Sequence, residues 1–249
     1  MIVSDDGHDE ATRDIAGQIG ATYTQGPQAG LAANRNHALQ YVQTPLVAFV
    51  DDDVIVSTDY IQAATSLDTD AITTGQVLNF MDSGVGELVT PHNADFWGFQ
   101  RLDPDGDLRS IVVVATVFPT SVFDKIRFDE RLWYGAEEID IAQRATSRGI
   151  QIRFDARLWV EHHSYTAGRE AYKASAIASR IYQNTKRHAI YDGNATKAVA
   201  FAILGPVQVV ASAARRRRFR EAAVGVKASA RGISWALTLL NPRSRAALR

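Results

Sequence analysis

Three consecutive carboxylates, Asp51, Asp52 and Asp53, follow an apolar run over residues 45–50. The run is rich in β-branched and aromatic residues, and it predicts a short strand that is buried on both faces. Side chains alternate along an extended segment, so Asp51 and Asp53 share one face while Asp52 points away. Two hard oxygen ligands on one face suit Mg2+ or Mn2+ carrying a diphosphate. On these residues alone, a solvated acidic turn that caps the helix starting near Thr58 is the simpler interpretation.

Two further polar groups stand near the start of the chain. Asp5 and Asp6 follow a strand predicted over residues 1–3, where a carboxylate can accept from a base N–H or a ribose hydroxyl. Gly30 opens a predicted helix in which backbone N–H groups and Arg35 can face a phosphate. The ordinary alternatives are an aspartate that caps the next helix, and a helix start with a surface arginine.

Carboxylates and histidines also gather in the second half of the chain. The helix predicted over residues 137–147 carries Glu137, Glu138 and Asp140 in its first turn. The helix macrodipole favours ionised carboxylates there, and that placement is common for structural reasons alone. The histidine pair at 162–163 follows a predicted strand, and a histidine in such a place is more often satisfied by hydrogen bonds than bound to metal.

The composition is that of a soluble globular protein of 249 residues, with 46% apolar and 22% charged residues. A net charge of −1 gives no global attraction to nucleic acid, so we expect no nucleic-acid partner. The chain has no cysteine, which excludes disulfides, thiolate metal sites and a cysteine nucleophile. It shows no signal peptide, and both features fit a reducing, cytoplasmic location.

The elements that must position these groups alternate between strands and helices over the first two-thirds of the chain. Strands are predicted over residues 71–80 and 111–118, and the alternation predicts an α/β fold with a mainly parallel sheet flanked by helices. The segment 81–109 is polar and without period, and Trp97 and Phe99 within it offer an aromatic platform for a sugar.

The pattern is helical from residue 169 onward, so we divide the chain into a domain over 1–168 and a helical region over 169–249. Residues 198–214 are mostly apolar but fall short of the ~20 residues that a spanning helix needs. Four arginines, 215–218, follow at once, and an amphipathic stretch completes the segment. These features are compatible with helices packed on the domain, but they favour a helix pair lying on an anionic membrane surface through residues 198–240.

The order and spacing of these motifs along the chain are more specific than any one of them. That order is Val-Ser-Asp-Asp-Gly at 3–7, Gly-Leu-Ala-x-x-Arg-Asn at 30–36, Asp-Asp-Asp at 51–53, Phe-Asp-Glu at 128–130, Glu-Glu-x-Asp-x-x-x-Arg at 137–144 and a late histidine. Over roughly residues 1–165 the chain resembles the inverting GT-A glycosyltransferases of family 2. The resemblance implies a Rossmann-like GT-A sheet that binds a nucleotide-diphosphate sugar and a divalent metal, Mg2+ or Mn2+.

Carried over by position, the resemblance implies a role for each group. Asp5 or Asp6 would contact the nucleotide base, Asp51 the ribose or the sugar, and Glu138 would be the catalytic base. The residues implied in binding the donor are Asp5, Asp6, Gly30, Arg35, Asn36, Asp51 and Asp52, and those implied in binding the metal are Asp51, Asp53 and His162. Glu137 and Asp140 are the alternative bases, and His163 is the alternative histidine.

Two departures from the family pattern stand out. Glu138 occupies a position where the family usually has aspartate, so its carboxylate must sit about one methylene further back. The family also begins with a strand and a helix before the position that corresponds to residue 1 here. We therefore expect a protein that starts at Met1 to be weakly active, to self-associate, and to be rescued by an N-terminal extension.

The function that follows is transfer of a sugar to an acceptor hydroxyl, with a saccharide or lipid-linked acceptor, in cell-envelope polysaccharide or glycolipid synthesis at the inner face of the plasma membrane. One alternative is a catalytically degenerate sugar-nucleotide fold that serves as an interaction module. Another is a Mg2+-dependent nucleotidyltransferase, although the usual glycine-rich phosphate loop with a basic residue is missing near the N-terminus. Release of nucleotide diphosphate from a panel of nucleotide sugars would separate the three.

Overall fold

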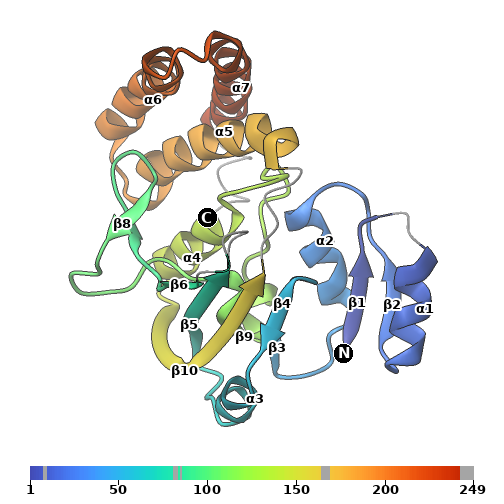
Figure 1. Ribbon diagram of the computed structural model, residues 1–249. Helices are drawn as coiled ribbons and strands as arrows, with labels where there is room; N and C mark the ends of the chain where they lie inside the picture. The colour runs from blue at the N-terminus through green and yellow to red at the C-terminus, as the bar shows by residue number, and fades with distance from the viewer. Residues whose placement is uncertain (8–9, 81–83, 85, 164–168, 242–249) are drawn as a thin grey trace.

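The computed structural model describes residues 1–7, 10–80, 84, 86–163 and 169–241. A curled sheet forms the middle of the molecule, and three long helices lie to one side of it (Figure 1). Within the described residues the largest sheet has six strands, in the order β3-β9-β5-β10-β4, with β6 added to β5. These strands are β3 (Leu46–Ala48), β4 (Val54–Val56), β5 (Ala71–Phe80), β6 (Gly86–Val89), β9 (Thr116–Pro119) and β10 (Gln151–His163).

This sheet is mixed, so the prediction of a mainly parallel sheet is wrong. The central pair β5–β10 is parallel, whereas β3–β9, β9–β5, β10–β4 and β5–β6 are antiparallel. The prediction assumed a helical crossover between successive strands, which parallel neighbours require. The chain instead returns from β5 through β6, through the two-residue strand β7 (Asn93–Ala94), and through β8 (Gln100–Leu102), before it reaches β9.

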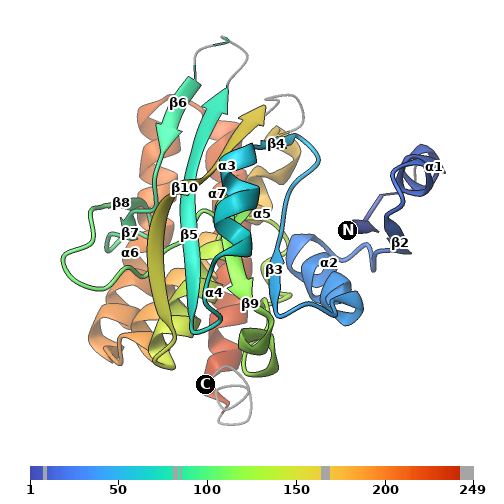
Figure 2. The same cartoon turned by 90° about the horizontal axis from the view of Figure 1, so that it is seen from below.

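The N-terminal elements form a small unit of their own. β1 (Ile2–Asp5) and β2 (Thr22–Gln25) pair in parallel, and α1 (Glu10–Gln18) connects them. Figure 2 shows this unit to one side of the six-stranded sheet, with α2 (Leu31–Ala38) leading from it towards β3. A 3-10 turn over Leu39–Tyr41 follows α2.

The strand before the three aspartates is an edge strand. β3 pairs only with β9 within the described residues, and its two larger side chains are half-buried. Val50 is 45% exposed, so the prediction of a strand buried on both faces is wrong. Phe49 provides the anchor instead, because its ring meets those of Phe118, Phe123 and Phe128 edge to face at 5.3–5.8 Å.

β10 runs as one long strand from Gln151 to the histidine pair. Its register against β5 shifts between Phe154 and Trp159, which marks a bulge. Gly75 of β5 lies at that point, and a Cβ there would come within 1.6 Å of the Leu158 carbonyl oxygen. The close approach therefore requires glycine, and it keeps β10 on the sheet as far as the histidine pair.

Helices pack against the sheet on both of its sides. α3 (Thr58–Thr65) contacts β10, and α4 (Glu137–Ser147) buries its apolar residues in the main core. The run 111–118, predicted as one strand, begins with a 3-10 turn over Val113–Ala115 and becomes strand only in β9.

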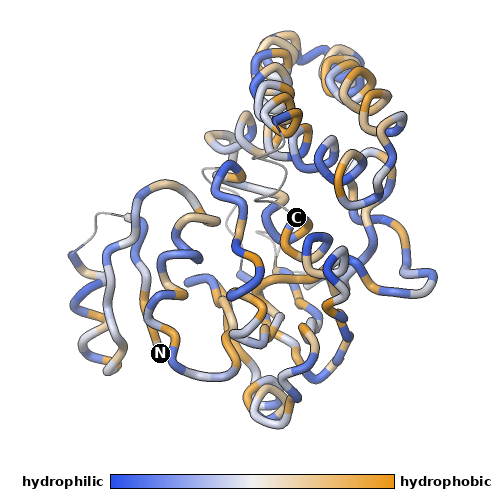
Figure 3. The backbone as a smooth tube through the Cα atoms, turned by 180° about the vertical axis from the view of Figure 1, so that it is seen from behind, coloured by the Kyte–Doolittle hydropathy of each residue, from blue (hydrophilic) through white to orange (hydrophobic). Residues whose placement is uncertain are grey.

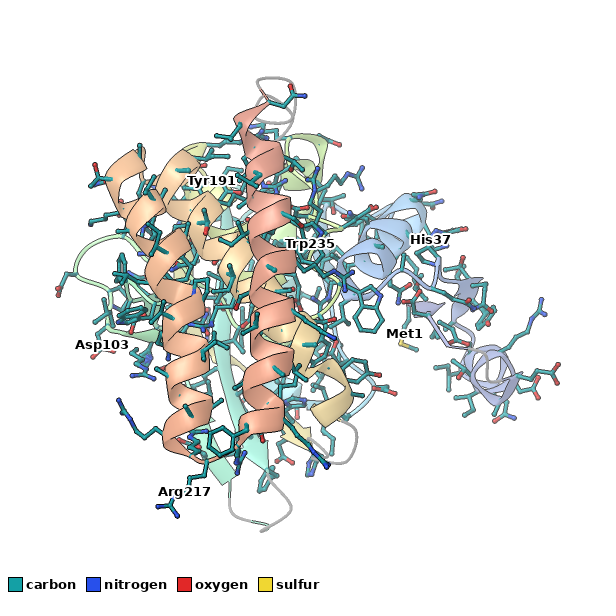
Figure 4. All side chains as sticks on the ribbon, turned by 90° about the horizontal axis from the view of Figure 1, so that it is seen from above. Met1, His37, Asp103, Tyr191, Arg217 and Trp235 are labelled. Carbon is teal, nitrogen blue, oxygen red and sulfur yellow. The ribbon has the colours of Figure 1, made fainter. Side chains whose placement is uncertain are left out.

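The C-terminal region is helical, as predicted. It consists of α5 (Arg169–Lys186), a π-helical turn (Arg187–Tyr191), α6 (Ala195–Arg215) and α7 (Phe219–Leu237) with a last 3-10 turn (Thr238–Leu240). Figure 1 shows α5 between the sheet and the other two helices, and Figure 4 shows α6 and α7 side by side. The predicted helical pattern at 242–249 lies outside the described residues.

Candidate functional site

Arg35 joins two of the carboxylate groups that the sequence singled out. Its Nη1 lies 3.1 Å from Glu137 Oε1, and its Nη2 lies 3.5 Å from Asp51 Oδ1. The side chain is 93% buried, and its guanidinium stands over the ring of Phe128. A buried arginine requires such partners, because removing its charge from water is costly. It therefore holds the end of β3 next to the start of α4.

α2 is held in place by its own polar residues. The Asn36 amide donates to the Phe128 carbonyl and accepts from the Phe128 N–H, both at 2.9–3.0 Å. Gly30, at φ 95°, lets the chain approach Trp133, whose Cδ1 would lie 2.4 Å from an added Cβ. The Leu31 N–H donates to the Trp133 carbonyl. These bonds attach α2 to the loop that precedes α4.

Glu138 has the electrostatic setting of a proton acceptor near neutral pH. Burial, the neighbouring charge of Glu137 and the charge of Asp51 raise its pKa to about 7, against the opposing effects of the Val113 backbone N–H and Arg35. Glu137 is itself buried, and its Oε2 has no hydrogen-bond partner among the described residues. The pair thus places a carboxyl group that is half protonated near pH 7 at the first turn of α4.

Asp140 has a different environment, although it stands only two residues further along α4. It is fully buried, and its oxygens lie 2.7 Å from Lys186 Nζ and 2.9 Å from Arg144 Nη2. The Tyr191 hydroxyl donates to it at 3.0 Å. With both oxygens engaged and no exposure, Asp140 offers no lone pair to an acceptor hydroxyl.

Asp53 and His162 meet at the other end of the acidic turn. Asp53 Oδ1 lies 3.2 Å from His162 Nε2, and each side chain is about a quarter exposed. The His163 N–H donates to the Asp53 carbonyl, which fixes the turn against β10. The His163 ring points elsewhere, because it stacks on Phe80 and lies 3.2 Å from Glu161 Oε2. Of the two histidines, the structure places His162 beside the aspartate.

The predicted metal ligands are therefore divided. Asp51 is engaged by Arg35, so it does not join Asp53 and His162, and Asp52 is exposed. Within the described ranges no three His, Cys, Asp or Glu side chains are gathered as a complete metal site. A carboxylate and an imidazole nevertheless fit a divalent ion that takes its remaining ligands from water and substrate phosphates, as Mg2+ commonly does. Asp53 and His162 are the residues that would hold it.

The first two predicted donor contacts support the loops around them. Asp5 Oδ1 accepts from the Gly7 N–H at 2.8 Å, and its other oxygen accepts from the Tyr23 hydroxyl. The Asp6 carboxylate accepts from the backbone N–H groups of Gln28 and Gly30. Asp6 thereby holds the loop that opens α2.

The aromatic platform predicted at residues 97–99 faces α5. The centre of the Phe99 ring lies 4.6 Å from the guanidinium carbon of Arg101 and 4.8 Å from that of Arg180, and the Trp97 carbonyl accepts from Arg180. Part of the predicted loop, residues 81–83 and 85, lies outside the described residues.

A different aromatic group stands at the start of α4. Tyr134 stacks on Tyr172 of α5 at 4.7 Å, and Trp133 lies 5.6 Å from the same ring. Trp133 remains 40% exposed. Sequence reasoning missed this group, and its one sequence signal is the Trp-Tyr pair just before the glutamates.

Comparison with solved structures shows the same fold in glycosyltransferases. GalNAc-T7 with UDP, GalNAc and Mn2+ matches with TM-score 0.57 and 13% identity, over 77% of this chain and 42% of that one. TarS of S. aureus matches with a TM-score of 0.52 and 14% identity, over 82% of this chain and 36% of that one. The mannosyltransferase PcManGT of Pyrobaculum calidifontis, with GDP-Man and Mn2+, matches with a TM-score of 0.50 and 12% identity, over 96% of this chain and 77% of that one. The chain thus spans less than half the length of the first two.

No curated protein matches the sequence. The family model described as glycosyl transferase family 2 matches residues 1–113. That stretch contains Asp5, Asp6, Arg35 and the three aspartates, whereas Glu138 and His162 lie beyond it. The resemblance to family 2 is confirmed, and residues 1–113 of this chain are a glycosyl transferase family 2 domain.

Proposed function

We propose that the protein transfers a sugar from a nucleotide-diphosphate donor to an acceptor hydroxyl with inversion, and that Glu138 is the general base. The observation that carries the proposal is the setting of Glu138, whose pKa is raised to about 7 by burial and by Glu137. A general base is most effective when its pKa lies near the working pH.

The donor side of the proposed site lies at the acidic turn. Asp53 and His162 would hold a divalent ion together with the diphosphate, and the ion, when bound, neutralises charge on the leaving group. Asp51 is half-exposed beside Arg35 and can accept from a ribose or sugar hydroxyl. Arg35 keeps Asp51 and Glu137 in one place, so it orients the donor and acceptor sides relative to one another.

The acceptor side begins at the aromatic group before α4. The exposed face of Trp133 lies near Gly30 and in the loop that leads to Glu138, and an aromatic face of this kind can pack against an apolar face of a sugar ring. A hydroxyl placed there loses its proton to Glu138 as it attacks the anomeric carbon. The proposal includes that the acceptor is a saccharide or a lipid-linked molecule of the cell envelope, and that the transfer takes place in the cytoplasm.

The variant Glu138→Gln tests the proposal. With Mn2+ and a panel of nucleotide sugars, nucleotide-diphosphate release is expected to fall by about 10²–10⁴-fold, while donor binding measured by calorimetry is retained. In the parent protein the rate is expected to rise with pH through about 7, because the base must be deprotonated. Glu87→Gln, an exposed change on β6, is the matched control.

A stability measurement gives an independent readout of the same group. The folded-state pKa of Glu138 is above its ordinary value of 4.5, so the folded protein binds more protons between pH 4.5 and about 7. The free energy of unfolding therefore falls as pH rises through that window, and Glu138→Gln is expected to remove about 1–3 kcal/mol of this fall. Undiminished transfer by Glu138→Gln, with loss only in Glu137→Gln, would place the base one residue earlier. No release by the parent protein from any donor would favour a catalytically degenerate module.

A further inference from the structure

α6 carries an apolar stripe that no other part of the described structure covers. Val199, Ile203 and Val207 follow one another at intervals of four residues and are 58–63% exposed. Leu204 beside them is 45% exposed. Residues spaced by three or four lie on one face of a helix, so these side chains form a continuous surface. The helix contains no aspartate or glutamate.

The opposite face of α6 is committed to the protein. Ala198, Phe201 and Ala213 are buried, and the ring of Phe201 meets those of Phe96 and His188 at 5.7 and 6.0 Å. Gln208 accepts from Arg180 of α5 at 2.9 Å, which fixes the two helices in register. The exposed stripe is therefore the outer face of a helix that is packed firmly on its inner face.

Charge is distributed very unevenly between this region and the rest of the chain. Residues 195–240 contain eight basic residues and one acidic residue, whereas the remainder contains 19 basic and 27 acidic residues. Four of the arginines, 215–218, form the turn between α6 and α7 and are exposed. Figure 4 places Arg217 at the end of the helix pair where this turn lies. Phe219, the next residue, is 72% exposed.

α7 also exposes apolar and basic residues. Val226 is 53% exposed beside Lys227, and Arg220 and Arg231 are also exposed. The single acidic residue, Glu221, is engaged by Lys173 and Arg218. Figure 3 shows how apolar residues recur along the C-terminal helices.

We propose that the outer faces of α6 and α7, together with the arginine turn 215–218, bind an anionic lipid surface. The apolar side chains enter the boundary between headgroups and acyl chains, and the arginines contact anionic headgroups. The apolar stripe lies on α6 and the arginine turn joins α6 to α7, so both features belong to the same helix pair. The proposal concerns a surface that is separate from Glu138, so it can fail or succeed independently of the proposed activity.

The packing argues for a helix that lies on the membrane rather than across it. Among the described residues α6 is the helix long and apolar enough to span, and only 28% of its apolar window is buried. Spanning would require α6 to leave α5 and α7 and would carry the Gln208 side-chain carbonyl oxygen into hydrocarbon without its partner Arg180 of α5. Lying in the interface preserves every one of these contacts.

The chemistry also favours lipid over nucleic acid. Arginines at a turn can contact the phosphates of either partner. Burial of Val199, Ile203, Leu204 and Phe219 is gained only from a partner that offers an apolar phase, which a nucleic-acid backbone does not. Anionic vesicles are therefore the probe to use.

Vesicle flotation tests the proposal with the full chain. The protein is expected to float with phosphatidylcholine vesicles that contain phosphatidylglycerol, to float poorly with phosphatidylcholine alone, and to be released by high salt. Arg216→Ser with Arg217→Asn is expected to weaken binding by about 30-fold, since each basic residue near an anionic surface contributes about 5-fold to the affinity. Asparagine suits position 217, where φ is 56°.

The apolar stripe has its own variant and a matched control. Ile203→Glu with Val207→Glu is expected to abolish flotation, whereas Ile61→Glu, a change on α3 at 56% exposure, leaves it intact. Circular dichroism confirms that all variants remain folded. Equal binding to neutral and anionic vesicles would overturn the proposal, and so would retention after carbonate extraction, which indicates a spanning helix. Binding to DNA without binding to vesicles would overturn it as well.

Discussion

The carboxylates of the first turn of α4 show how the surroundings of a residue set its chemistry. Asp140 lies against Lys186 and Arg144, and its charge is fully compensated. Glu138 lies on the same turn beside Glu137 and Asp51, and burial with these charges raises its pKa to about 7. The same functional group is thus a structural anchor at one position and a titrating group at the other.

The pairing of Asp53 with His162 leads to a prediction at the same scale. Asp53→Ala and His162→Ala are each expected to weaken Mn2+-dependent binding of a nucleoside diphosphate by more than about 10-fold, because each removes one of the two proposed protein ligands of the ion. Isothermal titration calorimetry with and without Mn2+ measures this directly.

The neighbouring residues supply matched controls. Asp52→Ala removes an exposed carboxylate from the same turn, and His163→Ala removes the adjacent ring, which stacks on Phe80. Both controls are expected to bind as the parent does. A loss in Asp52→Ala with normal binding by Asp53→Ala would show that the metal is held by a different aspartate.

Between elements, a buried ionic network connects α4 with α5. Lys186 Nζ lies 2.6 Å from Asp129 and 2.7 Å from Asp140, and all three side chains are buried. Burial opposes the ionisation of Asp129, but the charge and hydrogen bond of Lys186 outweigh it, with help from Tyr182, and lower the pKa to about 2. α5 therefore positions the helix that carries Glu138, together with the loop that leads into it.

Breaking this network is expected to be costly. Lys186→Met leaves two buried carboxylates with Arg144 and a partly exposed Arg131, and the free energy of unfolding is expected to fall by about 3–5 kcal/mol at pH 7. The folded pKa of Asp129 is below its ordinary value of 3.8, so its stabilising contribution is present above that pH and is lost as pH falls towards 2. In the variant this acid-dependent loss is expected to be smaller, because Lys186 no longer lowers the pKa of Asp129.

Denaturant unfolding at pH 7 and an acid titration followed by circular dichroism measure both effects. Lys125→Met, an exposed change, is the control and is expected to behave as the parent. An unchanged midpoint in Lys186→Met would mean that the network contributes no net stability.

At the scale of the whole molecule, the buried apolar core is concentrated at the six-stranded sheet and does not extend into the described part of the N-terminal unit. The main cluster of buried apolar residues surrounds β5, β9 and β10 and draws none of its members from residues 1–25 among those described. The N-terminal unit is attached through polar contacts instead, such as those of Asn34 with Ser4 and of Asp6 with the loop before α2. A unit held in this way opens more readily than the sheet.

Hydrogen exchange is expected to show the difference. Backbone amides of β1 and β2 should exchange at least ~10-fold faster than those of β5 and β10, because the former lack an apolar core beneath them. Mass spectrometry of peptides from each strand measures the rates. Equal protection in both units would show that they open together as one cooperative body.

Much of the local structure could be predicted from the sequence. The bounds of α4 and β5 agree with the prediction, because helical spacing with a glycine stop and a long β-branched run are local signals. The direction of strand pairing was wrong, since it depends on how the chain crosses between strands rather than on the strands themselves. The family resemblance was confirmed, because motif order survives where overall identity does not.

The sequence by itself determined which residues bear chemistry, in what order, and on which kind of element. Only the tertiary structure decided their partners: Arg35 with Glu137, 102 residues away, and Asp53 with His162 rather than with Asp51. It also decided that Glu138 titrates near neutral pH while Asp140 lies in a buried ion pair. The reason is that burial and charge act through distance in space, and the groups that set these environments come from remote parts of the chain.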